Sequence, residues 1–355
     1  MRILLISPLP PPYGGIANWS RLLLEFARNT EDEFLNLNIA PKKRSTEGRG
    51  IFDRVVVSGF DMLKKKSELK RKIKTFKPDV IHLTTSGSLA VIRDYLMLKT
   101  AKSLGVPTVY HLHFGKAEEL LCAGSFLSRL FKKVIALANT VIAIDNKTFT
   151  ALKRHIPAAS FSLLPNPINL KALPEITDER EKRIVFIGWV IPEKGVSELV
   201  SAWNTVGKEY PDYELTIIGQ SRPDYLKSLK EQATVDNITF TGELPHNEAM
   251  KILSKSSVFV LPSYTEGCPY SVIEAMALKN TVIATSVGAI PEMLNNACGI
   301  AIEPKSTEEV AEALRNALSD KDSAENLAEN ACTKAWANYS AEVIYSKYKE
   351  IWSRL

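Results

Sequence analysis

The chain has 355 residues, of which 45% are hydrophobic and 24% are charged, and its formal net charge is +5. This length suits two domains of ordinary size, and the composition is normal for a soluble globular protein. The four cysteines form no C-x-x-C pair, which argues against a disulfide framework, and no apolar run approaches the length of a membrane span. The apolar run Met1–Leu9 is too short for the core of a signal peptide, so we expect a cytoplasmic protein.

Charge is divided unevenly along the chain. Residues 1–166 hold 26 Lys and Arg against 13 Asp and Glu, a net charge of +13. The remaining residues hold 19 against 27, a net charge of −8. Halves of opposite sign indicate two domains with different partners, and the alternative is a difference in solvated surface without functional meaning.

The first half begins with a strand, a glycine loop and a helix. Arg2–Pro8 reads as a buried parallel strand, Pro10–Gly15 as the loop and Ile16–Asn29 as the helix, which is the start of a Rossmann-like unit. Further strands are expected at Val80–Leu83, Thr108–Leu112 and Val141–Ile144. Short apolar strands that alternate with helical stretches predict a parallel sheet covered on both faces.

Two basic amphipathic helices are predicted in this half, at Asp61–Lys77 and Ser125–Ala138. The first carries eight Lys or Arg. Its apolar stripe at helical spacing consists of Met62, Leu69, Ile73 and Phe76. The ordinary interpretation is a helix with this stripe in the core and its basic face in solvent. The alternative is attraction to an anionic membrane surface, at about 1 kcal/mol per basic residue, whereas nucleic acid is a poorer explanation because no recognition motif is present.

A second series of strands and helices follows a linker marked by three prolines and the charged stretch Asp178–Arg183. Its strands are expected at Arg183–Gly188, Glu214–Gly219, Ile238–Gly242, Val258–Pro262 and Thr281–Thr285. We therefore predict an α/β protein with two doubly wound Rossmann-like domains that face a central cleft. The predicted domains are residues 1–170 and 171–335, followed by a C-terminal helix at 336–355 that packs back on the first domain.

The strongest chemical signal is the phrase PSYTEGCPYSVIE at Pro262–Glu274. It places Glu266 in the loop after an apolar strand and Glu274 about one turn into the following helix, with seven residues between them. Gly267 and Pro269 suit a tight loop that opens this helix. A helix N-terminus offers N–H groups and a positive dipole end to a diphosphate. Either glutamate alone would read as a solvated carboxylate, whereas the whole phrase indicates a ligand site.

With the following Ala275-Met276-Ala277, this phrase resembles the hallmark of family 4 of the retaining GT-B glycosyltransferases, P-S-x-x-E-G with an E-x7-E pair and E-A-M-A. The resemblance extends over nearly the whole chain, through several motifs in the order of the family. These are the Gly14–Gly15 loop, PDVIHL at Pro78–Leu83, HLHFG at His111–Gly115, LLPNPI at Leu163–Ile168, the turn Glu193–Gly195 and VGAIPEM at Val287–Met293.

The resemblance implies a retaining transfer of a sugar from a nucleotide-diphosphate donor of UDP or GDP type. The acceptor it implies is a glycan or lipid-linked glycan in bacterial-type polysaccharide or glycolipid biosynthesis, with the donor on the second domain and the acceptor on the first. Glu266 would contact the transferred sugar and Glu274 the ribose. Further donor-binding positions are expected at Gly14, Gly15, Gly188, Gly219, Leu244, Gly267, Cys268, Pro269, Tyr270 and Ser271.

Lys194 is the second expected catalytic residue, in the turn after the first strand of the second domain. Its ammonium would neutralise the diphosphate as it leaves, where charge develops in the transition state. A lysine in a turn is ordinarily a solvated surface residue, and only its register with the family selects this one. The family usually has an arginine directly after the strand glycine Gly188, and this chain has Trp189 there.

His113 is the third expected catalytic residue, because the family places a histidine here near the transferred sugar. His111 and His113 end a strand of the first domain, and alternation puts them on the same side. A structural, hydrogen-bonded role is the alternative for His111. His82 is expected to line the core or the cleft, without a role in the chemistry.

No bound metal or other cofactor is expected. Asp320-Lys321-Asp322 imitates a D-x-D metal motif but lies in a polar turn between helices, and no convincing ligand set is present. Two other interpretations remain open: a nucleotide-sugar epimerase or phosphorylase on the same double fold, and an inactive homologue that serves as a partner subunit. Trp189 keeps the second one open. The two glutamates together with Lys194 favour a transferase.

Overall fold

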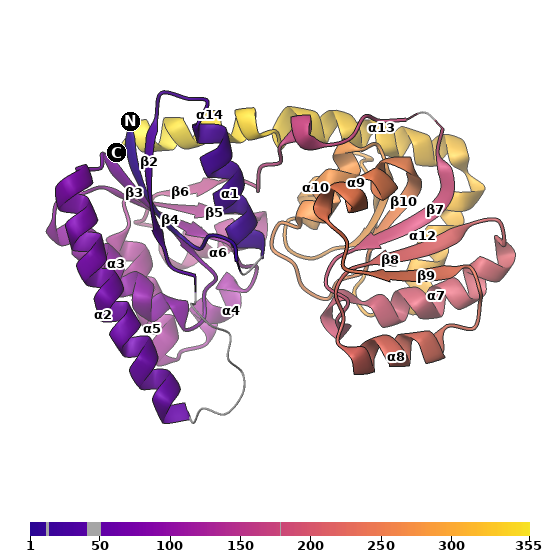
Figure 1. Cartoon of the computed structure of the whole chain (residues 1–355), viewed down its shortest axis with the longest axis horizontal. Coiled ribbons are helices and arrows are strands. Elements are labelled where there is room, and N and C mark those ends of the chain that lie inside the picture. The colour runs from indigo at the N-terminus through magenta and orange to yellow at the C-terminus, as the bar shows by residue number, and fades with distance from the viewer. Residues whose placement is uncertain (12–13, 41–50, 178) are drawn as a thin grey trace. The chain divides into compact units, whose positions relative to one another are not determined.

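The computed structural model describes residues 1–11, 14–40, 51–177 and 179–355, with the backbone alone for 51–61. Pro12 and Tyr13 of the predicted glycine loop, Asp178 of the predicted linker and the side chain of Asp61 in the first basic helix lie outside this description. The chain divides into two units, Met1–Pro167 with Ile344–Leu355, and Ile168–Val343. Each unit contains one sheet with helices packed against it (Figure 1).

The first unit has a six-stranded parallel sheet in the order β2-β1-β3-β4-β5-β6. Its strands are β1 Arg2–Ser7, β2 Glu33–Asn38, β3 Val80–Thr85, β4 Thr108–Leu112, β5 Thr140–Ala143 and β6 Phe161–Leu163. Its helices are α1 Gly15–Ala27, α2 Ile51–Phe76, α3 Ala90–Ser103, α4 Ala117–Cys122, α5 Phe126–Leu137, α6 Asn146–His155 and most of α14 Ala341–Ser353.

Alternation along the strands gives this sheet two different faces. Ile81 and Leu83 of β3 belong to an apolar core with residues of α2, α3 and α5. Leu69 and Ile73 of α2 are buried in that core, as the core-facing interpretation of the first basic helix predicts. His82 lies between Ile81 and Leu83 and contacts aromatic rings of α1 and α14 instead.

The second unit also has a six-stranded parallel sheet, in the order β12-β11-β10-β7-β8-β9. Its strands are β7 Glu181–Ile187, β8 Glu214–Ile218, β9 Ile238–Gly242, β10 Ser256–Leu261, β11 Thr281–Thr285 and β12 Ile300–Ile302. Its α-helices are α7 Val196–Glu209, α8 Pro223–Gln232, α9 His246–Lys255, α10 Tyr270–Ala277, α11 Ile290–Leu294, α12 Thr307–Ser319 and α13 Lys321–Asn338, and its 3-10 helices are η1 Leu170–Ala172 and η2 Pro192–Lys194. The strand order reverses between β7 and β10, which is where ligands bind in open α/β sheets. The predicted α/β class with two doubly wound sheets is confirmed.

The C-terminal segment differs from the single helix predicted at 336–355, because the chain breaks between α13 and α14. Ile168 pairs with the backbone at this break: its N–H donates to the Tyr339 carbonyl at 2.8 Å, and its carbonyl accepts from the Ala341 N–H at 2.9 Å. The hydroxyl of Ser340 accepts the N–H of Val343 at 3.2 Å and so caps the new helix. The predicted start at Trp336 therefore falls inside α13.

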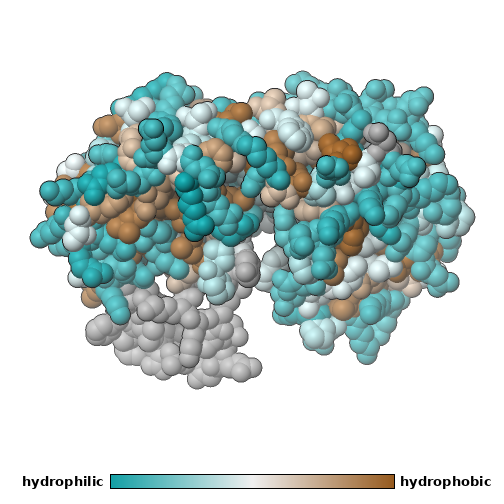
Figure 2. All heavy atoms as spheres, turned by 45° about the horizontal axis from the view of Figure 1, so that its top comes forward, coloured by the Kyte–Doolittle hydropathy of each residue, from teal (hydrophilic) through white to brown (hydrophobic). Residues whose placement is uncertain are grey.

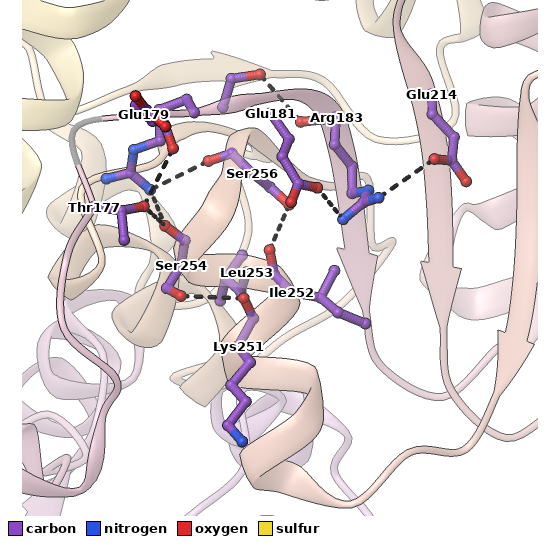
Figure 3. A network of polar contacts seen from close by, with 12 residues as sticks. Thr177, Glu179, Glu181, Arg183, Glu214, Lys251, Ile252, Leu253, Ser254 and Ser256 are labelled. Atoms are coloured by element: carbon purple, nitrogen blue, oxygen red, sulfur yellow. Dashed lines mark hydrogen bonds and ion pairs between the residues drawn. The ribbon is translucent and has the colours of Figure 1, made fainter.

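The amino ends of the strands in the second unit carry paired charges (Figure 3). Nη1 of Arg183 lies 2.5 Å from Oε2 of Glu181, and Nη2 lies 3.5 Å from Oε2 of Glu214. Two cavities of about 570 and 360 Å³ open beside this network and share Thr177 and Glu181 in their linings. Both cavities lie at the amino ends of the strands, whereas a ligand of such a sheet is expected at the carboxyl ends. Arg183, in the lining of the smaller cavity, is already paired with Glu181 and Glu214, and we assign neither cavity a part in the chemistry.

Hydrophilic side chains cover most of the face drawn in Figure 2, with apolar residues in smaller groups between them. Within the described part of the chain, no helix combines the length and the apolar character that a membrane crossing requires.

Candidate functional site

Two of the expected catalytic residues meet at the carboxyl ends of β7 and β10. Nζ of Lys194, at the end of η2, lies 2.5 Å from Oε1 of Glu266 in the loop after β10. The side chain of Glu266 is 9% exposed and that of Lys194 is 23% exposed. The pair therefore lies, partly shielded from water, where the strand order reverses and where a ligand of such a sheet is expected.

The two loops that carry this pair are joined to each other. The N–H of Tyr264 donates to the carbonyl of Glu193 at 2.9 Å, one residue before Lys194. The phenol of Tyr264 lies 2.5 Å from Oε1 of Glu198 on α7 and donates a hydrogen bond to it. Burial, together with the Glu198 carboxylate, raises the pKa of Tyr264, so the phenol keeps its proton. These bonds fix the distance between the loop after β7 and the loop after β10.

The VGAIPEM phrase, Val287–Met293, also holds the loop that carries Glu266. The N–H of Ala289 donates to the carbonyl of Gly267 at 2.8 Å. Gly288 has φ +59°, and a Cβ there would lie 2.5 Å from the Glu266 carbonyl oxygen. A side chain at position 288 would therefore displace the peptide that holds Glu266, which is a structural reason for this glycine.

Glu274 lies on α10 and is buried, with 7% of its surface exposed. Its Oε1 lies 2.7 Å from Nε2 of His246, the first residue of α9. His246 is a candidate that the sequence analysis missed, although its neighbour Leu244 was expected to bind the donor. The contact joins two helices that follow different strands, so no local pattern signals it.

The expected donor-binding residues at the strand ends form a connected rim. The N–H of Gly188 donates to the carbonyl of Ile218 at 3.0 Å, and the N–H of Gly219 donates to that of Gly242 at 2.8 Å. A Cβ at Gly219 would lie 1.7 Å from the Gly188 carbonyl oxygen. Close packing of the strand ends is thus sufficient to require glycine at position 219. Leu244 is half-buried and follows β9 by two residues.

The loop between β10 and α10 brings the remaining expected residues to the helix N-terminus. Cys268 and Pro269 are buried, whereas Gly267, Tyr270 and Ser271 are partly exposed. Pro269 occupies the N-cap position, where it makes no side-chain capping bond. The positive end of this helix is therefore not neutralised by its own cap, which suits a phosphate group.

Gly14 and Gly15 precede and open α1 in the first unit. A Cβ added to either glycine meets no atom of the described residues within 4 Å, and Gly14 has an extended backbone with φ 173°. Packing within the described residues therefore does not account for these two glycines.

His113 packs against two other rings of the first unit. Its ring centroid lies 4.0 Å from that of His111 and 5.0 Å from that of Trp19, and the two histidines lie together as strand alternation predicts. Burial lowers the pKa of His113 to about 3, which keeps the ring neutral. The N–H of His113 donates to the carbonyl of Thr85 at 2.9 Å and ties it to the end of β3.

Trp189 follows Gly188 at the end of β7 and is 49% exposed.

The stretch Asp320-Lys321-Asp322, which imitates a D-x-D motif, opens a helix. Asp320 caps α13, because its Oδ1 accepts the N–H of Ser323 at 3.0 Å. Across the residues that the structure describes, no group of three or more His, Cys, Asp or Glu is placed to hold a metal ion.

Comparison with known proteins matches both halves of the chain to glycosyltransferase families. Residues 37–172 match the model described as Glycosyltransferase Family 4, and residues 173–334 match the model described as Glycosyl transferases group 1. The putative teichuronic acid biosynthesis glycosyltransferase TuaC of Bacillus subtilis is 27% identical over 295 residues, which are 77% of this chain and 71% of that protein.

Solved structures agree in fold over the full length. Anabaena HepE, crystallised in complex with UDP, has a TM-score of 0.80 at 17% identity and is covered in full, as is this chain. Sucrose-phosphate synthase from Thermosynechococcus elongatus has a TM-score of 0.77 at 20% identity, with 99% of this chain and 98% of that chain covered. The two family models together span residues 37–334, and the chain is a glycosyltransferase with the two-domain GT-B fold.

Proposed function

We propose that the chain is a retaining glycosyltransferase that moves a sugar from a nucleotide diphosphate of UDP or GDP type onto a glycan or lipid-linked glycan. The contact between Lys194 and Glu266 at the reversal of the second sheet carries this proposal. Breaking a bond between a sugar and a diphosphate creates negative charge on the phosphate and positive charge on the sugar. A lysine and a carboxylate side by side supply the complementary charges for both.

The donor binds the second unit in this proposal. Its diphosphate lies at the N-terminus of α10 and is neutralised by Lys194, since the helix dipole and the ammonium both favour negative charge. Glu274 accepts hydrogen bonds from the ribose hydroxyls, and His246 holds its carboxylate. Gly188, Gly219 and Leu244 line the nucleotide at the strand ends. HepE, of the same fold, was crystallised with UDP, which supports a nucleotide ligand of this kind.

The sugar is oriented by Glu266 and by the neutral ring of His113. A neutral imidazole donates and accepts hydrogen bonds without placing a positive charge next to the developing cation of the sugar. Retention follows from a front-face reaction in which no residue of the chain becomes covalently attached to the sugar. Lys194 and α10 supply the positive charge at the diphosphate without a metal ion.

The acceptor binds the first unit, whose strongly basic surface suits an anionic glycan or a lipid-linked glycan at the cytoplasmic face of a membrane. Phe126, at the start of α5, is 65% exposed, and the following turns carry the exposed residues Arg129, Lys132 and Lys133. An exposed aromatic ring next to basic side chains is suited to an anionic lipid surface. The name of TuaC, which refers to teichuronic acid biosynthesis, supports an anionic polysaccharide as the product class.

A two-stage assay tests the proposal. Thermal unfolding of the full chain with UDP, GDP and a panel of their sugar conjugates identifies the donor, because a ligand at about a hundred times its dissociation constant adds about 2.7 kcal/mol. Incubation of that donor with bacterial glycolipids and polysaccharide fragments then measures transfer, and NMR of the product reads the anomeric configuration. Binding without transfer or hydrolysis would favour an inactive partner subunit, and an inverted product would exclude retention.

A further inference from the structure

A chain of hydrogen bonds joins the C-terminal helix to the histidines of the first unit. Nε1 of Trp352, on α14, lies 3.1 Å from Nδ1 of His82 on β3. Nε2 of His82 lies 3.2 Å from Nδ1 of His111 on β4. All three side chains are buried, with at most 1% exposed. We call this the Trp352–His82–His111 chain.

The direction of every bond in this chain follows from the chemistry of its first member. An indole N–H can only donate, so Nδ1 of His82 must accept. A neutral imidazole carries one proton, so the proton of His82 is on Nε2 and is donated to Nδ1 of His111. His111 therefore accepts at Nδ1 and carries its own proton on Nε2. One tryptophan thus determines the tautomer of two histidines.

The surroundings keep both histidines neutral, as this deduction requires. Burial lowers the pKa of His82 to about 3, and burial together with the neighbouring histidines lowers that of His111. The rings of Trp19 and Tyr348 enclose them, with centroids 5.1 Å and 5.9 Å from the ring of His111. An aromatic shell provides no carboxylate to compensate an imidazolium.

The Trp352–His82–His111 chain ends beside His113, at Nε2 of His111. Nε2 of His111 and Nε2 of His113 are both buried without a hydrogen-bond partner among the described residues, and the two rings are 4.0 Å apart. An unpartnered buried N–H is costly, and two such nitrogens on adjacent rings could share one hydrogen-bonding oxygen.

We propose that Trp352 is a positioning residue for sugar transfer, because it fixes His111 as an Nε2–H donor that, with His113, holds one hydroxyl oxygen. The inference rests on the proposed function in one respect only, the assignment of that hydroxyl to the reacting sugar. It also gives the C-terminal helix a role, since α14 supplies the group that sets the proton positions at the end of β4.

Nitrogen-15 NMR of histidine-labelled full-length protein at pH 7 directly tests the tautomers in the Trp352–His82–His111 chain. We expect His82 and His111 to show the Nε2–H tautomer in the wild type. Trp352→Phe removes the N–H while keeping an aromatic ring, and it should turn the His82 signals into those of a tautomer mixture. Trp336→Phe is the matched control, because that indole donates to the Ala277 carbonyl in the second unit. An Nδ1–H tautomer at His111 in the wild type, or signals that Trp352→Phe leaves unchanged, would overturn the proposal.

Kinetics test the consequence for transfer. Trp352→Phe should lower kcat about tenfold, as expected for one misdirected hydrogen bond, while the dissociation constant for UDP or GDP stays the same because the nucleotide binds the other unit. His82→Gln retains an amide donor for His111 and should preserve most turnover, whereas His82→Leu should not. Wild-type turnover in both Trp352→Phe and His82→Leu would refute the positioning role even if the tautomer is as proposed. A wild type that transfers no sugar contradicts the proposed function instead, and the NMR result still decides the tautomer.

Discussion

His246 Nε2 and Glu274 Oε1 lie 2.7 Å apart, although the two residues are 28 positions apart in the chain and lie on different helices, α9 and α10. The carboxylate is buried, whereas the side chain of His246 is 60% exposed. The histidine therefore holds one oxygen of the carboxylate from the solvent side.

Loss of this contact should weaken nucleotide binding. Glu274→Ala removes the ribose partner and should raise the dissociation constant for the nucleotide diphosphate, with a smaller effect on kcat at saturation, because ribose contacts are the same before and during the reaction. His246→Ala should have a smaller effect in the same direction, about two- to tenfold, since it removes one partner of the carboxylate. Calorimetry measures both, with Asn247→Ala as the exposed neighbouring control. Unchanged affinity in His246→Ala would remove this residue from the site.

Lys194 and Glu266 should differ in what their loss affects. Lys194→Ala should lower kcat by about a hundredfold or more, because the charge on the leaving diphosphate is no longer neutralised. Glu266→Ala should also lower kcat, yet diphosphate binding should be retained or become tighter, since Lys194 loses its competing carboxylate. Steady-state kinetics with the sugar donor and calorimetry with the free nucleotide diphosphate separate the two effects.

The double variant serves as the control for this pair. Lys194→Ala alone leaves the shielded Glu266 carboxylate without its cation, which costs stability as well as activity. Removing both residues should recover much of the melting temperature and none of the turnover. Recovery of turnover together with stability would show that Lys194 acts only through the fold.

Trp189 occupies the position where the family usually has an arginine, and it is half exposed at the end of β7. Trp189→Arg should therefore tighten binding of the nucleotide diphosphate by about tenfold, the effect of a charged hydrogen bond to a phosphate. Trp336→Arg is a matched control, because that tryptophan is exposed to the same extent in the same unit. Weaker binding in Trp189→Arg, with an unchanged melting temperature, would show that the tryptophan itself contacts the ligand.

Strands were predictable where burial makes the sequence uniformly apolar, as in RILLIS at Arg2–Ser7. The three missed strands are all edge strands: β2, EFLNLN, alternates with polar residues, and β6 and β12 have three residues each. Lys194 was selected only by its register with the family, since its contact with Glu266 spans 72 positions. His246 depends on the packing of α9 near α10, which no local spacing encodes.

The membrane prediction concerns α2, where Leu69, Ile73 and Phe76 pack in or against the core and the basic side chains are exposed or half-exposed. Reversing Lys64, Lys66 and Lys70 to Glu should abolish association with vesicles that contain anionic lipid, and salt should weaken the wild-type association. Lys65 is left intact because its Nζ donates to the Asn38 carbonyl at 2.6 Å. Vesicle sedimentation measures the effect.

Charge reversal at Lys208, Lys227 and Lys230, exposed residues of the second unit, changes net charge by the same amount and is the control. It should leave vesicle association intact. Equal binding of the wild type to neutral vesicles, or equal loss in both triple variants, would sink the membrane interpretation.

The buried histidines also predict how stability depends on pH. His82 and His113 have pKa values of about 3 in the folded chain, below the ordinary value of 6.5 that applies after unfolding. Between these two values the unfolded chain binds more protons than the folded one, so the free energy of unfolding falls as the pH drops below about 6.5. Each such histidine contributes a slope of about 1.4 kcal/mol per pH unit in that window, and its contribution is fully present above it.

Replacing one member of the cluster should reduce that dependence. Urea unfolding of His82→Leu between pH 7.5 and 5 should show a mean slope shallower than that of the wild type by about 0.8 kcal/mol per pH unit, whatever the variant loses in absolute stability. The difference is smaller than the full slope because the unfolded histidine is only partly protonated in the upper half of this range. His155→Leu, at the end of α6 and outside the cluster, controls for removal of a histidine as such. The comparison relies on slopes because deletion of a buried ring changes the free energy of unfolding at every pH. Equal slopes in wild type and His82→Leu would mean that His82 takes up its proton in the folded chain, and the tautomer assigned to it from Trp352 would then lose its basis.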